Sequence, residues 1–125
     1  MNLNQVTIYS NKVPESVEFY KKLGLRLIVD SIPLYARFIC PDGNTSLSLH
    51  ESSEVPTKSN IVLYFECKNL DTKITELKQI GLLFETEIID QTWLWREAYL
   101  KDPNGNTICL FYAGENRLNP PWRVN

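Results

Sequence analysis

The chain has 125 residues, which is the length of one domain that can bury a sizeable core. Its formal net charge of -2 gives no basis for a nucleic-acid or anionic-membrane partner. No apolar run approaches the roughly 20 residues that a membrane span requires.

The three cysteines and the start of the chain favour a cytoplasmic protein. Cys40, Cys67 and Cys109 are odd in number and widely spaced, which fits reduced thiols better than a disulfide framework or a zinc site. Residues 1–5 lack the basic and apolar regions of a signal peptide.

The first half of the chain predicts a strand, a helix and three more strands. Residues 3–9 alternate and are rich in β-formers, which is typical of a strand. Residues 10–23 are predicted as a helix, because Pro14 suits its first turn and Gly24 suits the residue that ends it. Strands are then predicted at 25–31, 34–40 and 45–50, with Asp42 and Gly43 as a strong hairpin signal.

The second half predicts the same order of elements. Residues 51–59 are polar and without periodicity, so they form the predicted linker. A strand at 60–67 precedes a helix that Asn69 is expected to cap, with one apolar face made by Leu70, Ile74, Leu77 and Ile80. Strands are predicted at 83–90, 94–100 and 106–112, followed by an irregular tail over 113–125 with Trp122 as its anchor.

Two pairs of motifs indicate that the halves are copies of one unit. An apolar-Gly-Leu motif ends each predicted helix, at 23–25 and 80–82, and a Pro-Asp/Asn-Gly-Asn turn follows at 41–44 and 103–106. The sequence therefore predicts a single α+β domain over 1–125, with β-α-β-β-β modules at 1–50 and 60–112.

These motifs also carry a resemblance to a known family. Residues 19–25 (FYKKLGL) and 100–106 (LKDPNGN), together with the paired modules, resemble the vicinal oxygen chelate superfamily. That superfamily holds glyoxalase I, fosfomycin- and bleomycin-resistance proteins, and extradiol dioxygenases. The resemblance implies a curled mixed sheet around a ligand cavity, helices outside, and a homodimer that binds a small organic molecule.

Strand alternation divides the side chains of the four strands that line the family's cavity. In the first, fourth, fifth and eighth predicted strands, the more polar set shares one face. The candidate ligand-binding residues on that face are Gln5, Tyr9, Ser48, Tyr64, Cys109 and Phe111, with His50 and Glu66 as candidate catalytic residues. Any one of them alone has an ordinary structural explanation, but agreement among four strands favours a cavity.

The resemblance implies four metal-ligand positions, which fall on Gln5, Ser48, Val62 and Cys109. Valine cannot bind a metal and serine is a poor ligand, so we expect no metal and no cofactor. A shift of two residues would instead place His50 and Glu66 beside Gln5 as a metal site. His50 is the only histidine of the chain, which excludes a two-histidine dioxygenase site.

The segment 93–99 is the other candidate. Trp93 and Trp95 are predicted on one strand face, where they would stack on a flat ligand, and Arg96 on the other could bind a carboxylate or phosphate. Equally, the tryptophans could fill a dimer interface or anchor the tail, and Arg96 could pair with Glu97 or a surface acid.

The preferred interpretation is a metal-free protein that binds a small organic molecule in an aromatic-lined cavity. One alternative is a metal-dependent lyase, isomerase or dioxygenase of the same superfamily. The other is a metal-free acid/base isomerase that uses His50 and Glu66, since an imidazole transfers protons readily near neutral pH.

Overall fold

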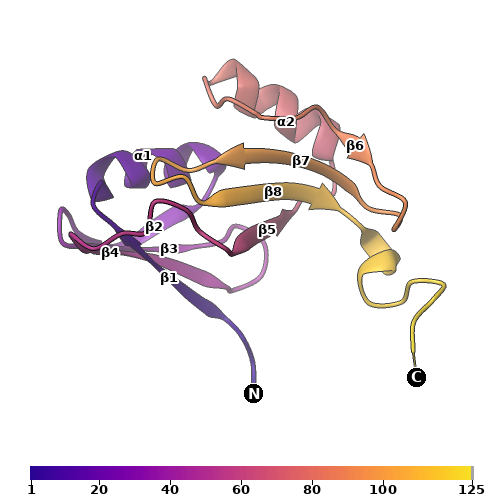
Figure 1. Cartoon of the computed structure of the whole chain (residues 1–125), viewed down its shortest axis with the longest axis horizontal. Coiled ribbons are helices and arrows are strands. Elements are labelled where there is room, and N and C mark those ends of the chain that lie inside the picture. Colours follow the sequence, from indigo (N-terminus) through magenta and orange to yellow (C-terminus); the bar gives the residue numbers. More distant parts are fainter. Residues whose placement is uncertain (125) are drawn as a thin grey trace. The chain divides into compact units, whose positions relative to one another are not determined.

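The structure is a computed structural model that describes residues 1–124. The chain forms two compact units: unit 1 comprises residues 1–58 and 102–105, and unit 2 comprises residues 59–101 and those from 106 onward. Each unit holds a four-stranded mixed sheet with one helix on one of its faces (Figure 1). This arrangement confirms the predicted α+β fold of two β-α-β-β-β modules.

The two units share one topology. Unit 1 contains β1 (Gln5–Ser10), α1 (Val13–Leu23), β2 (Arg26–Ser31), β3 (Tyr35–Ile39) and β4 (Ser46–Glu51). Unit 2 contains β5 (Val62–Glu66), α2 (Leu70–Gln79), β6 (Ile89–Asp90), β7 (Arg96–Lys101), β8 (Thr107–Tyr112) and the 3-10 helix η1 (Gly114–Arg117). The strand orders are β1-β4-β3-β2 and β5-β8-β7-β6, in which only β1–β4 and β5–β8 are parallel pairs.

Helix α1 covers one face of the first sheet. Pro14 lies in its first turn, and Gly24 ends it with a φ of 114°, a conformation that glycine adopts without a side-chain clash. The helix begins at Val13 rather than at the predicted residue 10, because Ser10 still belongs to β1. The apolar core of unit 1 is formed by Val13, Val17, Tyr20, Leu23, Ala36, Phe38, Leu47 and Leu49.

The turn at 102–105 completes unit 1. Tyr20 of α1 is fully buried, and its hydroxyl donates a hydrogen bond of 2.7 Å to the Asp102 carboxylate. Asn104 donates from its amide nitrogen to the Asn11 side chain at 2.8 Å, and its amide oxygen contacts Ser10. The Asp-Pro-Asn-Gly motif is therefore fixed by specific polar contacts as well as by its own turn geometry.

Helix α2 covers one face of the second sheet, with Leu70, Ile74 and Leu77 buried. The prediction that Ile80 continues this face is wrong: α2 ends at Gln79, and Ile80 is 50% exposed. Leu82 is buried beyond the turn at Gly81 instead. Asn69 lies at the N-cap position, but its side chain makes no capping hydrogen bond.

The middle of unit 2 differs most from the prediction. Within the predicted strand 83–90, only β6 and an isolated bridge between Phe84 and Leu100 pair with β7. The predicted strand 94–100 starts two residues later, because residues 91–95 form a turn. In this turn the Gln91 amide donates to the Trp95 carbonyl at 2.8 Å, and Leu94 has a positive φ of 68°. Trp93 therefore lies in a turn, and not on a strand face with Trp95.

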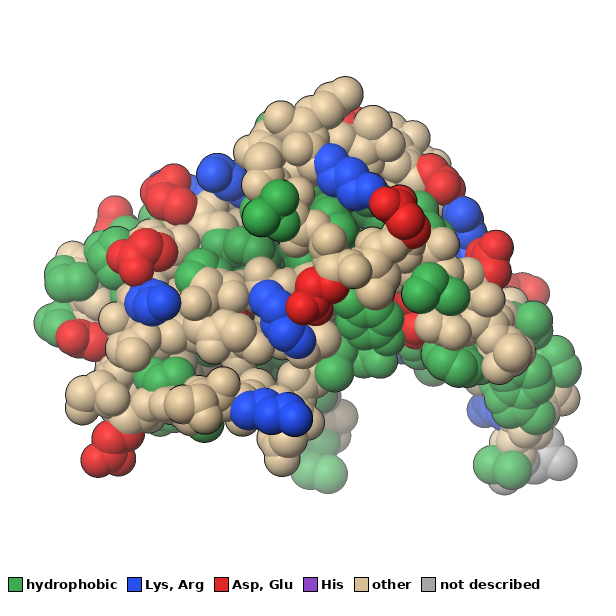
Figure 2. Space-filling model, turned by 45° about the horizontal axis from the view of Figure 1, so that its top comes forward, with side chains coloured by type: hydrophobic (Ala, Val, Ile, Leu, Met, Phe, Trp, Pro, Cys, Tyr) green, Lys and Arg blue, Asp and Glu red, His purple; other side chains and the backbone are tan. Residues whose placement is uncertain are grey.

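The predicted tail contains η1, and Trp122 is 56% exposed rather than anchored within the chain. Charged side chains of both signs are interspersed on the face drawn in Figure 2. Among the helices of residues 1–124, none has the length and apolar character of a membrane-spanning segment.

Candidate functional site

Each sheet has one face covered by its helix and one open face, and the polar candidates of unit 1 lie on the open one. The register pairs Thr7 with Ser48 and Tyr9 with His50 across the parallel strands β1 and β4. Paired residues share a face, and the alternate residues Leu47 and Leu49 are buried on the helix side. The open face of unit 1 therefore carries Gln5, Thr7, Tyr9, Ser48 and His50.

A chain of hydrogen bonds joins three strands on this face. The Gln5 amide nitrogen donates to Ser48 Oγ at 2.8 Å, and the Ser48 and Tyr35 hydroxyls are 2.7 Å apart. Arg37 Nε donates to the Tyr35 hydroxyl at 2.9 Å. The Ser48 hydrogen bond lowers the pKa of Tyr35, and Arg37 contributes to the same shift. The face can therefore stabilise negative charge at the Tyr35 oxygen.

His50 lies at the edge of this network. Its ring contacts Tyr9 and Tyr35 edge-on, with centroid distances of 5.6 and 6.1 Å, and it is exposed. His50 Nδ1 lies 3.0 Å from the Glu51 carbonyl oxygen, which can only accept a hydrogen bond. Nδ1 therefore carries the proton in the neutral ring, and Nε2 is left as an acceptor.

The sequence-based prediction did not include Tyr35 and Arg37. It assigned side chains to the two faces of the sheet only for the strands that line the family's cavity, and β3 is not one of these. The register places Tyr35 opposite His50 and Arg37 opposite Ser48. The signal was available: the predicted hairpin at 41–44 makes β3 the antiparallel neighbour of β4, and its alternation then puts both residues on the polar face.

The face of the second sheet that α2 does not cover holds an aromatic cluster, of which Phe111 is only 4% exposed. The Trp95 and Phe111 rings stack with centroids 4.7 Å apart and an interplanar angle of 21°. Tyr64 meets both rings edge-on, at 5.9 and 5.5 Å, and is 47% exposed. We call Tyr64, Trp95 and Phe111 the aromatic platform.

Glu97 lies beside the aromatic platform and was also missed by sequence reasoning. It is 1% exposed, and its carboxylate accepts hydrogen bonds from Gln91 at 3.0 Å, Trp93 at 3.3 Å and Tyr99 at 3.0 Å. Burial and the Glu97 hydrogen bond raise the pKa of Tyr99. A buried carboxylate held by three uncharged donors fixes the ring positions of Trp93 and Tyr99.

Cys109 lies on the same face, paired in register with Tyr64 and Tyr99. It is fully buried, and this burial, followed by the charge of Glu97, raises the pKa of its thiol to about 12. Cys109 is therefore a neutral thiol near pH 7.

Glu66 has a structural role within unit 2. Its carboxylate accepts hydrogen bonds from the backbone N–H groups of Ala113 and Gly114, both at 2.9 Å, and lies 3.7 Å from the Arg117 guanidinium. The Trp95 indole N–H donates to the Asn116 carbonyl at 3.4 Å. These contacts hold the start of the tail against the sheet. They also engage the carboxylate of Glu66, which is a candidate catalytic residue.

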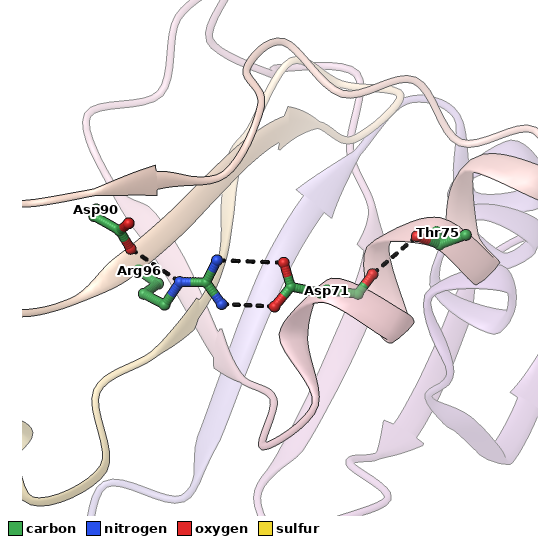
Figure 3. A network of polar contacts seen from close by, with 4 residues as sticks. All are labelled: Asp71, Thr75, Asp90 and Arg96. Atoms are coloured by element: carbon green, nitrogen blue, oxygen red, sulfur yellow. Dashed lines mark hydrogen bonds and ion pairs between the residues drawn. The ribbon is translucent and has the colours of Figure 1, made fainter.

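Arg96 lies in a network of ion pairs (Figure 3). Its guanidinium donates to both carboxylate oxygens of Asp71, at 2.6 and 3.2 Å, and to Asp90 at 2.9 Å. Its pKa is raised chiefly by the Asp71 and then by the Asp90 hydrogen bond. A hollow at the start of α2 includes Arg96 and Tyr112 in its lining, but two carboxylates already neutralise the arginine. Arg96 thus follows the alternative in which it pairs with surface acids.

The donor set of the four family positions does not fit a metal ion. The Gln5 amide is engaged with Ser46 and Ser48, Val62 has no donor atom, and Cys109 is a buried neutral thiol. Among residues 1–124, no group of three or more His, Cys, Asp or Glu side chains is arranged to hold a metal. For the alternative set, His50 and Glu66 each have partners of their own in unit 1 and unit 2 respectively.

Comparison with known proteins agrees with this fold. The model of the Glyoxalase/Bleomycin resistance protein/Dioxygenase superfamily matches residues 2–110. The chain belongs to this superfamily. Because the superfamily's name spans enzymes and resistance proteins, membership alone does not assign a reaction.

Individual relatives are more distant. The uncharacterized protein YraH of Bacillus subtilis (strain 168) is 28% identical, over 89% of this chain and 98% of that protein. A glyoxalase/bleomycin resistance protein/dioxygenase from Nocardioides has a TM-score of 0.80 and 23% identity, covering 100% of this chain and 90% of its own. A bleomycin-binding protein in complex with bleomycin has a TM-score of 0.72 and 17% identity, covering 90% and 98%. At these identities the solved structures establish the fold alone.

Proposed function

We propose that this protein binds a small organic molecule with a flat apolar part, and that it does so without a metal ion. The aromatic platform is the observation that carries this proposal. Trp95 and Phe111 are stacked, and Tyr64 is half exposed at their edge. Phe111 is only 4% exposed, so it supports the other two rings, and the partly buried Trp95 and the exposed Tyr64 offer the contact area for a flat ligand.

Preorganisation of the neighbouring side chains supports the same function. Glu97 holds Trp93, a residue that is 44% exposed, and Tyr99 in fixed positions. A site whose side chains are already ordered loses less entropy when it binds a ligand. The bleomycin-binding protein, which has a similar fold, binds bleomycin.

Ligand binding with and without a chelator tests the proposal. Bleomycin and 8-anilinonaphthalene-1-sulfonate are suitable flat aromatic probes, and calorimetry or tryptophan fluorescence reports their binding. We expect saturable binding that EDTA does not change. Trp95→Leu is expected to weaken this binding about tenfold, because an aromatic contact contributes about 0.5–1.5 kcal/mol beyond the area it buries.

The matched control is Trp122→Leu, because Trp122 is exposed in the tail and away from the aromatic platform in sequence. Equal loss of binding in both variants, or binding that disappears with EDTA, would contradict the proposal. The second of these outcomes would favour the metal-dependent alternative.

We also propose that the protein is a homodimer in the cytoplasm. Several large apolar side chains are exposed on the single chain, among them Leu3 at 89%, Leu83 at 86% and Leu118 at 61%. A second copy that packs against any one of these side chains would remove apolar surface from water. Cys40, Cys67 and Cys109 are all thiols, which suits a reducing compartment. Sedimentation velocity tests the dimer, and a monomer at micromolar concentration would contradict it.

A further inference from the structure

Tyr35 and Arg37 of β3 belong to one hydrogen-bond network with Gln5 and Ser48. Gln5 donates to Ser48 Oγ, and Ser48 is fully buried, so the hydroxyl proton of Ser48 requires an acceptor within the protein. The Tyr35 oxygen at 2.7 Å is that acceptor. Arg37 Nε donates to the same oxygen.

The Tyr35 oxygen thus accepts two hydrogen bonds, which uses both of its lone pairs. Its own proton is left to be donated outside this network, on the open face of unit 1. The lowered pKa of Tyr35, caused first by Ser48 and supported by Arg37, is consistent with two donors directed at this oxygen.

The charge of Arg37 is the second feature of this network. Its guanidinium carbon lies 5.5 Å from the Tyr35 ring centroid, and within residues 1–124 Nε is the guanidinium nitrogen that donates a hydrogen bond. Among residues 1–124, no carboxylate forms an ion pair with Arg37. Arg96 of unit 2, by contrast, is paired with two aspartates. The terminal amino groups of Arg37 form a planar fork, whose geometry matches a carboxylate or phosphate.

We propose that Arg37 and Tyr35 form an oxyanion-binding site that holds the carboxylate or phosphate group of a small organic molecule on unit 1. The Arg37 fork supplies the charge, and the Tyr35 hydroxyl supplies a further donor. His50 Nε2, next to Tyr35, is an acceptor for a hydroxyl or amide group of the same ligand. The site uses residues of unit 1 alone, so it does not depend on the aromatic platform of unit 2.

Titration of ¹⁵N-labelled full-length protein with matched small molecules tests this site. Benzoate and phenyl phosphate carry the two oxyanions, and benzamide is the uncharged counterpart of benzoate. We expect saturable shifts of amide signals in β3 and β4 with at least one oxyanion. Benzamide should bind about tenfold more weakly, because the guanidinium forms stronger hydrogen bonds with a charged acceptor than with a neutral one. The tighter of the two oxyanions identifies the ligand class.

Three variants separate the site from general charge effects. Arg37→Gln should weaken oxyanion binding about tenfold or more, and Arg37→Lys should restore only part of it, because lysine lacks the fork. Tyr35→Phe keeps the ring and removes only the hydroxyl. The control is Lys22→Gln, which removes one positive charge from the exposed side of α1 in the same unit and should bind as the wild type does.

The proposal is overturned if neither oxyanion gives saturable shifts, if benzamide binds as tightly, or if the shifts map to unit 2. Equal losses in Lys22→Gln and Arg37→Gln would also overturn it. Should Arg37→Gln fail to fold by circular dichroism, Tyr35→Phe and Arg37→Lys still decide the question. Failure of the flat aromatic probes with retained benzoate binding would contradict only the proposed function of unit 2.

Discussion

The Tyr20 hydroxyl donates to the Asp102 carboxylate at 2.7 Å, and both residues are buried although they lie 82 positions apart. One residue comes from the helix motif and the other from the turn motif by which the sequence resembles its superfamily. The two motifs are thus parts of one packing contact, which explains why their presence indicates a fold and leaves the activity open.

Loss of this hydrogen bond should destabilise the protein. Tyr20→Phe leaves the buried Asp102 carboxylate without this donor, so we expect the free energy of unfolding to fall by about 1–3 kcal/mol. Urea unfolding followed by circular dichroism measures the change. Tyr112→Phe is the control, since Tyr112 is 40% exposed. A change in Tyr20→Phe no larger than in the control would contradict this role.

The same residue gives a prediction about alkaline pH. Burial, with the Asp102 charge and hydrogen bond, raises the pKa of Tyr20 in the folded state above its unfolded value of about 10. The folded state keeps a proton that the unfolded state releases, so this contribution to stability is present below pH of about 10 and is lost as pH rises further. Unfolding measured between about pH 9 and 12 should show a shallower alkaline decline for Tyr20→Phe than for Tyr112→Phe. Parallel curves for the two variants would refute the assignment to Tyr20.

Glu97→Gln should reduce both stability and ligand binding. The amide of glutamine keeps one acceptor oxygen but turns an NH₂ group towards donors that need an acceptor. We therefore expect the free energy of unfolding to fall by about 1–3 kcal/mol. Trp93 and Tyr99 would lose a common partner, and flat aromatic probes should bind less tightly. Glu85→Gln is the matched control, because Glu85 is half exposed and forms an ion pair with Lys101 at 3.6 Å. Unchanged melting temperature in Glu97→Gln would contradict the role of Glu97.

Glu66→Ala should release the start of the tail. It leaves the N–H groups of Ala113 and Gly114 without their carboxylate acceptor and removes the ion pair to Arg117. Limited proteolysis should then cut after Arg117 faster than in the wild type, whereas Glu87→Ala, at an exposed position, should not change the rate. If Glu66 were catalytic and did not hold the tail, Glu66→Ala would abolish enzymatic turnover and leave the rate of limited proteolysis unchanged.

Metal content tests the donor-set argument directly. Protein purified without chelator and analysed by elemental mass spectrometry should hold far less than one metal ion per chain, and EDTA should leave its melting temperature unchanged. Near-stoichiometric nickel, zinc, manganese or iron would show that the ligand positions were misassigned.

Local patterns in the sequence determined most of the fold. Three such patterns are the alternation of strands β1, β4, β5 and β8, the glycine that ends α1, and the hairpin signal at 41–44. Each depends on residues that are close together in the sequence, so a short segment is enough to predict it. The repeated helix-end motifs at 23–25 and 80–82 and the repeated turns at 41–44 and 103–106 then indicated the paired modules. These features were sufficient to place Gln5, Ser48 and His50 on one face of a sheet.

Only the tertiary structure decided what those side chains do. Trp93 was predicted on a strand face, but it lies in a turn. The turn over residues 91–95 is accompanied by the hydrogen bond from Trp93 to the buried Glu97 and by the positive φ of Leu94. Glu66 proved to hold the tail, and Arg96 to pair with Asp71 and Asp90, because their partners are distant in sequence. Hydrogen bonds and ion pairs depend on distances of a few ångströms between segments far apart in the chain, which no local pattern encodes.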